Sequence, residues 1–314
     1  MPALELVGGI AYLLMGGDLL VRGAVALSRR LRVAPAIVAF TVVAFGTSLP
    51  ELVVGLRAAR TGLAEIAFGN VVGSNIANVL LVVGATAVIY PLATTDRSGR
   101  RDAVWMVGAS VAMAALAWGG TLHRTAGLLL LAGLGVATAF SAREAIRSRV
   151  IEDPSTPIEW VLGMPRALPM ILLFLLAGLV GLPLGARLML EGSVEIATSL
   201  GVSNTVIGLT LVAISTSLPE LATTVVAAFQ RRTELVLSTV VGSNLFNVLG
   251  IMGASSLASP EPIPVLGRAV VLDLPMMLAG SLLLGVLVWR SRPIGRRLGI
   301  VLFGLYIAYL LSFA

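Results

Sequence analysis

The chain has 314 residues, of which 57% are hydrophobic and 12% are charged. A soluble domain carries about a quarter charged residues, so this composition is typical of a protein embedded in a lipid bilayer. The lack of cysteine excludes disulfides and thiolate metal sites. The net charge is +6, but the arginines responsible lie in short clusters between apolar segments, so we predict no nucleic-acid partner.

Ten apolar segments are long enough to cross a bilayer, which takes about 20 mainly apolar residues in a helix. The first is predicted to be a true span rather than a cleaved signal peptide, because no basic residues precede it and Asp18 and Arg22 interrupt it. The predicted fold is therefore an all-α membrane protein with ten transmembrane helices. The expected spans are 4–27, 34–59, 66–92, 103–119, 126–142, 168–190 (or to 199), 204–229, 235–257, 269–289 and 298–313.

The two sets of five spans repeat each other. The motif Thr-Ser-Leu-Pro-Glu occurs at 47–51 and 216–220, and the motif Val-Gly-Ser-Asn occurs at 72–75 and 241–244, so both recur 169 residues later. An odd number of spans in each repeat inverts the second copy in the membrane, which is the plan of many secondary transporters. We expect two inverted five-helix repeats over 1–142 and 166–314, joined by a linker over 143–165.

The distribution of arginine orients the predicted spans. With the N-terminus outside, the internal loops hold sixteen arginines and the external loops hold four, which agrees with the positive-inside rule. We therefore predict a multi-pass protein of the plasma (inner) membrane, with both termini outside and the central linker in the cytoplasm.

Each Thr-Ser-Leu-Pro-Glu motif is predicted to gather oxygen atoms on one side of a helix. The proline removes a backbone donor and displaces the carbonyl four residues back, which belongs to Gly46 or Ser215. In a bilayer such a carbonyl needs protein, water or an ion as its partner. Thr47, Ser48 and Glu51 share a helical face, so their oxygens and the loosened carbonyls form a ligand set suited to hard cations.

Glu51 and Glu220 are costly residues for a membrane protein. A charged side chain at the centre of a bilayer costs about 2.5–3.5 kcal/mol on insertion scales. Two carboxylates at matched depth in inverted halves are expected to meet near the midplane. Their repulsion raises this cost unless a cation lies between them.

The Gly-Ser-Asn helices are predicted to add neutral ligands. Ser74 and Asn78 are four residues apart and share a helical face, as do the serine and asparagine of the second copy. For Asn75 and Asn244, two interpretations stay open: they are ligands, or they join helices by hydrogen bonds.

Charged pairs occur in the first span of each repeat. Asp18 and Arg22 are four residues apart, and their counterparts are Arg187 and Glu191, with the signs exchanged. We interpret both as internal ion pairs with a structural role.

At these motifs the sequence resembles the sodium/calcium exchanger family of the cation/calcium antiporter superfamily. The segments 44–51 and 69–78, repeated at 213–220 and 241–247, are similar to the two alpha-repeats of that family, which we place over 44–84 and 213–253. The resemblance implies a prokaryotic member without a regulatory domain, because the linker is too short to hold one. It also implies that the chain is not an enzyme and has no covalent cofactor, with the bilayer, Ca²⁺ and Na⁺ as its partners. A monomer is expected to be sufficient for transport, and the oligomeric state stays open.

The resemblance further implies a set of ion ligands. These are Thr47, Ser48, Glu51, Ser74 and Asn78 in the first half, and Ala213 (through its carbonyl), Thr216, Ser217, Glu220, Ser243 and Asn247 in the second. A prokaryotic relative has aspartate at the place of Asn247, and potassium-dependent relatives have aspartate at the place of Asn78. The two asparagines argue against potassium dependence and leave the sodium sites open.

The predicted function is antiport of Na⁺ against Ca²⁺ by alternating access at a site that Glu51 and Glu220 share. A proton/calcium antiporter of the same superfamily stays open, because the glutamates could also exchange protons. An intramembrane hydrolase with paired acids is a remote alternative. It is disfavoured because the sequence offers no catalytic histidine or cysteine and no Gly-x-Gly-Asp motif.

Overall fold

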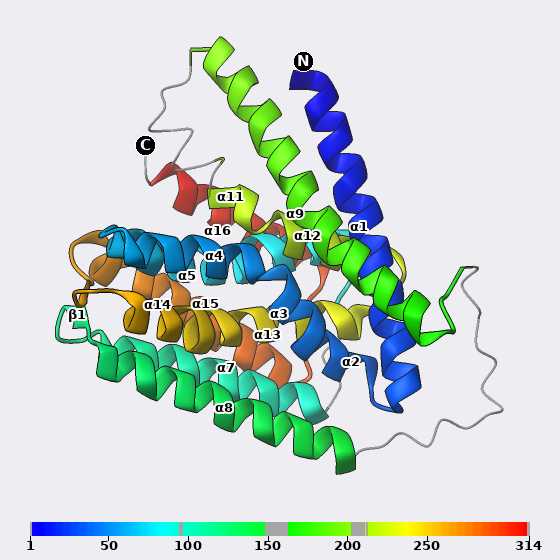
Figure 1. The fold of residues 1–314 in the computed structure, drawn as a ribbon, viewed down its shortest axis with the longest axis horizontal. Coiled ribbons are helices and arrows are strands. Elements are labelled where there is room, and N and C mark those ends of the chain that lie inside the picture. The colour runs from blue at the N-terminus through cyan, green and yellow to red at the C-terminus, as the bar shows by residue number, and fades with distance from the viewer. Residues whose placement is uncertain (1, 94–96, 148–162, 202–210, 212, 313–314) are drawn as a thin grey trace.

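The computed structural model describes residues 2–93, 97–147, 163–201, 211 and 213–312, which are mostly helical (Figure 1). The helical segments of the first half are α1 (Pro2–Leu31), α2 (Pro35–Val38), η1 (Ala39–Val43), α3 (Ala44–Thr47), α4 (Leu49–Arg60), α5 (Ala64–Ala77), η2 (Asn78–Val83), α6 (Gly84–Ile89), α7 (Arg97–Leu116) and α8 (Arg124–Arg147). Those of the second half are α9 (Leu168–Ser199), α11 (Ala213–Thr216), α12 (Leu218–Phe229), α13 (Thr233–Phe246), η4 (Asn247–Met252), α14 (Gly253–Ala258), η5 (Ala269–Asp273), α15 (Leu274–Trp289) and α16 (Arg296–Leu311). The η segments are π-helical turns.

Each predicted span corresponds to a described helix or run of helices, apart from differences at the boundaries. Six described helices are long and apolar enough to cross a membrane, and the run from Pro35 to Arg60, bent by 44°, counts as a seventh. The other three fall short for simple reasons. α16 has 16 residues, α7 begins with a charged turn, and α12 follows the stretch 202–210, which lies outside the described residues.

Some boundaries differ from the prediction. The first span ends at Leu31 rather than at 27, and the fourth begins at Arg97 rather than at 103, because basic residues extend both helices beyond their apolar parts. The sixth span reaches Ser199, the longer of the two expected ends. Most of the predicted linker, 148–162, lies outside the described residues.

Helices α1 and α9, the first of each repeat, lie side by side and project beyond the other helices (Figure 1). Gly9 of α1 faces Gly185 of α9, and a Cβ atom at Gly9 would lie only 2.9 Å from the carbonyl oxygen of Gly185. Gly23, farther along α1, faces Leu175, which comes earlier in α9. The two helices are therefore antiparallel, which confirms that the second repeat is inverted relative to the first.

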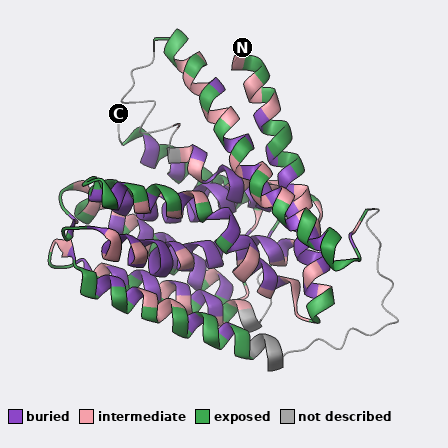
Figure 2. Ribbon diagram, viewed as in Figure 1, coloured by how far each residue is buried: buried purple, intermediate pink, exposed green. Residues whose placement is uncertain are grey.

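The third and eighth spans form the centre of the molecule. In the most apolar 18-residue stretch of these two spans, 64–89 and 233–258, 78% and 89% of the residues are buried, against 33% and 28% in the corresponding stretches of α1 and α9. Figure 2 shows the buried residues concentrated among the central helices. The exposed apolar side chains of the outer helices are suited to contact with lipid.

Equivalent contacts hold the two halves together. Ser110 of α7 and Ser281 of α15 share a hydrogen bond of 3.1 Å. Gly84 of α6 packs against α16, and its counterpart Gly253 of α14 packs against α8. At one end of this core, β1 (Thr121–Leu122) pairs antiparallel with β2 (Ile263–Pro264). The repeat seen in the sequence is thus a repeat of tertiary contacts.

Both predicted ion pairs form, but the prediction that the pair in α9 is internal was wrong. Arg22 Nε lies 2.8 Å from Asp18 Oδ2, and Gln230 beyond the end of α12 donates to Asp18 Oδ1 over 2.8 Å. In α9 the Arg187–Glu191 pair, at 2.7 Å, is largely exposed, with 76% of the arginine side chain accessible. The α1 pair therefore ties its helix to the core through Gln230.

The glycine contacts between α1 and α9 give a stability test. Gly9→Leu should lower the thermal unfolding temperature by several degrees, because its side chain would clash with the backbone of Met189, and overpacking costs about 1–3 kcal/mol. Gly8→Leu is the matched control, since no described atom lies within 4 Å of its Cβ position. Thermal unfolding in detergent would measure both variants, and equal unfolding temperatures would contradict this account of the contact.

Candidate ion-binding site

Both Thr-Ser-Leu-Pro-Glu motifs interrupt a helix at the serine. α3 ends at Thr47 and α4 begins at Leu49, and the chain bends by 44° between them. Ser217 separates α11 from α12 in the same way, with almost the same backbone angles as Ser48. The proline then occupies the first turn of the next helix, where it needs no backbone donor. The motif therefore directs both broken ends of the helix toward one place.

The two glutamates lie in the first turns of α4 and α12, and both are buried, with 1% of each residue exposed. The amino end of a helix carries partial positive charge, which favours a carboxylate there. Ser48 Oγ donates to Glu220 Oε1 over 3.0 Å, so the break in the first half holds the carboxylate of the second.

Several buried oxygens of this region have no hydrogen-bond partner among the described residues. They are Glu51 Oε2, Glu220 Oε2, Asn78 Oδ1, Asn247 Oδ1 and Ser217 Oγ. Leaving a buried acceptor without a partner costs about 1–3 kcal/mol, and more when it is charged. In the described parts of the chain, no three His, Cys, Asp or Glu residues gather around one point, so neutral oxygens must complete any cation shell around these two carboxylates.

Four asparagines join the two central helical runs. Asn75 Nδ2 donates to the backbone oxygen of Asn244 over 3.3 Å, and Asn244 Nδ2 donates to the backbone oxygen of Asn75 over 3.5 Å. Asn78 Nδ2 donates to Asn244 Oδ1, and Asn247 Nδ2 donates to Asn75 Oδ1, both over 3.0 Å. Of the two interpretations for Asn75 and Asn244, the structure supports hydrogen bonding between helices.

The other predicted residues have the following contacts and places. Ser243 Oγ and Thr47 Oγ1 both donate to the backbone oxygen of Ala44, over 3.4 and 3.3 Å. Gly242 brings α13 so close to the carbonyl of Phe40 that no side chain fits between them. The remaining members have these places: Ser74 is buried in α5, Thr216 ends α11 and is half-buried, and Ala213 is the first residue of α11.

Two residues support the glutamates without having been predicted. Asn70 Nδ2 donates to the backbone oxygen of Glu51 over 3.1 Å, and Thr224 Oγ1 donates to that of Glu220 over 2.8 Å. The sequence contains a pattern that could have indicated both residues. Thr224 follows Glu220 by four residues, and Asn70 precedes Ser74 by four, so each continues the polar face of its helix.

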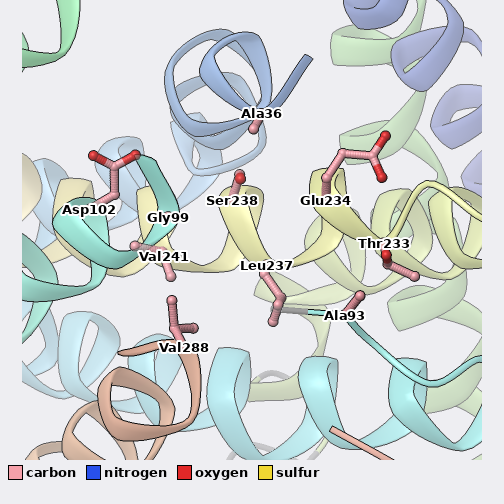
Figure 3. Close-up of a pocket in the computed structure, with 10 residues that line it drawn as sticks. All are labelled: Ala36, Ala93, Gly99, Asp102, Thr233, Glu234, Leu237, Ser238, Val241 and Val288. Atoms are coloured by element: carbon pink, nitrogen blue, oxygen red, sulfur yellow. The ribbon is translucent and has the colours of Figure 1, made fainter. Parts of the chain in front are cut away.

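A pair of related pockets flanks this core. One, of about 130 Å³, has an apolar floor of Leu237, Val241 and Val288, while Figure 3 shows the carboxylates of Asp102 and Glu234 turned away from Val241 and Val288. The other, of about 230 Å³, is lined in part by counterparts of these residues in the opposite repeat, including the carboxylates of Glu65 and Asp273. The described linings of both pockets lack Glu51 and Glu220, so neither pocket is the place where the two glutamates lie.

Known proteins resemble this chain over nearly its whole length. Inner membrane protein YrbG of Escherichia coli is 32% identical over 97% of this chain and 94% of its own. Putative antiporter CaxA of Alkalimonas amylolytica is 32% identical over 96% and 95%. Sodium/calcium exchanger MaX1 of Methanosarcina acetivorans is 31% identical over 96% and 95%.

Solved structures of the sodium-calcium exchanger NCX_Mj have the same fold. The structure soaked with 2.5 mM Na⁺ and 10 mM Sr²⁺ has a TM-score of 0.82 at 30% identity, and the match covers 99% of each chain. The sequence model of the sodium/calcium exchanger protein family, a family of transporters rather than enzymes, matches residues 2–143 and 170–314. This chain therefore belongs to the sodium/calcium exchanger protein family.

Proposed function

We propose that this chain exchanges Na⁺ for Ca²⁺ across the membrane, at a site that Glu51 and Glu220 share. The observation that carries the proposal is the set of buried oxygens that lack hydrogen-bond partners among the described residues, which come from both carboxylates, both asparagine amides and a serine hydroxyl. Oxygen ligands of these types are those that hard cations such as Ca²⁺ prefer. The likeness to MaX1 and NCX_Mj, both named as sodium/calcium exchangers, supports the choice of ions.

The full proposed ligand set combines the breaks with the central helices. Its members are Thr47, Ser48, Glu51, Ser74, Asn78, the carbonyl of Ala213, Thr216, Ser217, Glu220, Ser243 and Asn247. Ca²⁺ and Na⁺ compete for the same oxygens in this arrangement, so the site binds either Ca²⁺ or Na⁺ but not both at once. That competition makes transport an exchange rather than a symport.

The charge of the site sets the proposed electrical behaviour. Two carboxylates neutralise one Ca²⁺, whereas three Na⁺ at the same site leave one positive charge. Movement of one charge through the membrane potential is worth about 2.3 kcal/mol per 100 mV. We propose an electrogenic cycle in which Na⁺ entry drives Ca²⁺ export.

The proposed alternating access uses the α1–α9 pair as its moving part. This pair is far less buried than the two central spans, and it touches the core where Gly17 of α1 packs on Ala222 of α12. Sliding of the pair over the core would expose the site to each face in turn. We propose that the two repeats comprise residues 1–142 and 166–314. A cytoplasmic linker over 143–165 is proposed to join them.

The proposed location is the inner membrane, with both termini outside. The arginine count of sixteen inside against four outside supports this orientation. The name of YrbG, an inner membrane protein, agrees with the location. A monomer contains every proposed ligand and is proposed to be sufficient for transport.

Ion coupling can be tested by flux in proteoliposomes. An outward Na⁺ gradient should drive Ca²⁺ uptake, and a membrane potential that is negative outside should change its rate, because the cycle moves charge. Uptake of Ca²⁺ driven by a pH gradient without Na⁺ would contradict the proposal and favour the proton/calcium antiporter.

Removing either buried carboxylate should abolish exchange. Glu51→Gln or Glu220→Gln leaves the site with one negative charge, so Na⁺-driven Ca²⁺ uptake should fall by at least about 100-fold, since losing one partner of a buried ionic contact costs about 3–5 kcal/mol. Glu65→Gln is the matched control, because Glu65 is exposed in the first turn of α5. Full activity in either site variant would rule out the shared site.

A third carboxylate should make transport depend on pH. In Asn247→Asp, one Ca²⁺ no longer neutralises the site, so a proton should bind to the surplus carboxylate as the pH falls. Exchange measured between pH 6 and pH 9 should then vary more steeply with pH than in the unsubstituted protein. Identical pH profiles would contradict the placement of Asn247 in the site.

A further inference from the structure

A neutral amide is an ambiguous ligand for a cation. One end of the Asn78 or Asn247 side chain is an oxygen that attracts a cation, and the other end is an NH₂ group that repels it. Rotation by 180° exchanges the two ends at almost no change in shape. A site built with asparagines therefore needs a device that fixes which end faces the ion.

The hydrogen bonds between the central helices provide such a device, and they start from backbone carbonyls. The backbone oxygen of Asn244 only accepts hydrogen bonds, so the Asn75 side-chain atom 3.3 Å from it must be the NH₂ nitrogen. The other end of Asn75 is then its oxygen, and it can accept only from the NH₂ group of Asn247, 3.0 Å away. The Asn247 oxygen is left on the opposite side of that amide, buried and without a partner among the described residues.

An equivalent set of hydrogen bonds orients the side chain of Asn78. Asn244 Nδ2 donates to the backbone oxygen of Asn75 over 3.5 Å, and Asn244 Oδ1 accepts from Asn78 Nδ2 over 3.0 Å. Asn78 Oδ1 is likewise buried without a partner in the described structure. Each half of the molecule therefore orients a side chain of the other half.

We infer that Asn75 and Asn244 are positioning residues, which hold the amide oxygens of Asn247 and Asn78 toward the transported cation. This inference rests on the proposed function, because it assumes that the two oxygens bind Ca²⁺. It also assigns a pairing: Asn75 serves Asn247 in the opposite half, and Asn244 serves Asn78. A merely structural role would not require this crossed pairing.

The test is Ca²⁺ binding to the purified full-length chain, measured by equilibrium binding of radioactive Ca²⁺ in detergent. Asn75→Ala removes the acceptor that holds the Asn247 amide, so Ca²⁺ affinity should fall about tenfold. Asn244→Ala should have a similar effect through Asn78. Thermal unfolding without ions checks that each variant is folded, and the second variant replaces the first if that one fails to fold.

The decisive comparison adds a carboxylate, whose two ends are both oxygens and need no orientation. In an Asn247→Asp background, Asn75→Ala should change Ca²⁺ affinity by less than about twofold. In an Asn78→Asp background, the same Asn75→Ala substitution should still cause the tenfold loss, because Asn75 does not hold residue 78. Asn244→Ala should show the reverse pattern in these two backgrounds.

The outcomes separate the positioning role from the proposed function. Asn75→Ala with unchanged affinity, or with an equal loss in both aspartate backgrounds, would overturn the positioning role and leave the proposed function intact. If the unsubstituted chain binds Na⁺ but no Ca²⁺, the proposed function fails and the inference fails with it. The positioning role would be established if Asn75→Ala lowers Ca²⁺ affinity in the Asn78→Asp background but not in the Asn247→Asp background, and if Asn244→Ala shows the reverse.

Discussion

A carboxylate buried in a bilayer needs a compensating charge, and the arrangement of this protein around Glu51 and Glu220 follows from that need. Both carboxylates are buried at the amino ends of helices, where the backbone offers partial positive charge. Ser48 supplies a hydroxyl to Glu220 across the two halves. The second oxygen of each carboxylate still lacks a partner among the described residues, which is the place that a cation would fill.

The inverted repeat explains how one chain builds such a site. Inversion places equivalent helix breaks opposite each other, so one short motif supplies ligands twice. The same symmetry appears in the asparagine contacts, where Asn75 and Asn244 each donate to the other's backbone. It is incomplete where α1 meets the core, because Asp18 binds Gln230 while the α9 ion pair stays exposed. The central helices thus keep the symmetry of the site, and the outer pair departs from it.

The spans, the repeat and its inversion were accessible from the sequence, because apolar length and constant offset are local properties of the chain. Proline acts on its immediate neighbours, so a disturbed helix near Pro50 was expected, but the break at Ser48 was not, because Thr47, Ser48 and Glu51 were placed on one face of a continuous helix. The bond from Ser48 to Glu220 did not follow, because it depends on how two distant segments pack. The asparagine contacts were likewise out of reach, since spacing places Asn75 on a helix face but does not say what faces it. Gln230 was missed for the same reason.

The account depends on a divalent cation lying between the two glutamates, and the location of that cation can be measured directly. Crystals of this protein soaked in Sr²⁺, with diffraction recorded at the strontium absorption edge, would show the cation as an anomalous peak. The account predicts one peak within about 2.3–2.6 Å or slightly more of oxygens from both Glu51 and Glu220, as for a calcium-like ion. The peak should disappear as Na⁺ replaces Sr²⁺ in the soak. A peak bound to neither glutamate, or one that persists unchanged at high Na⁺, would contradict the shared site.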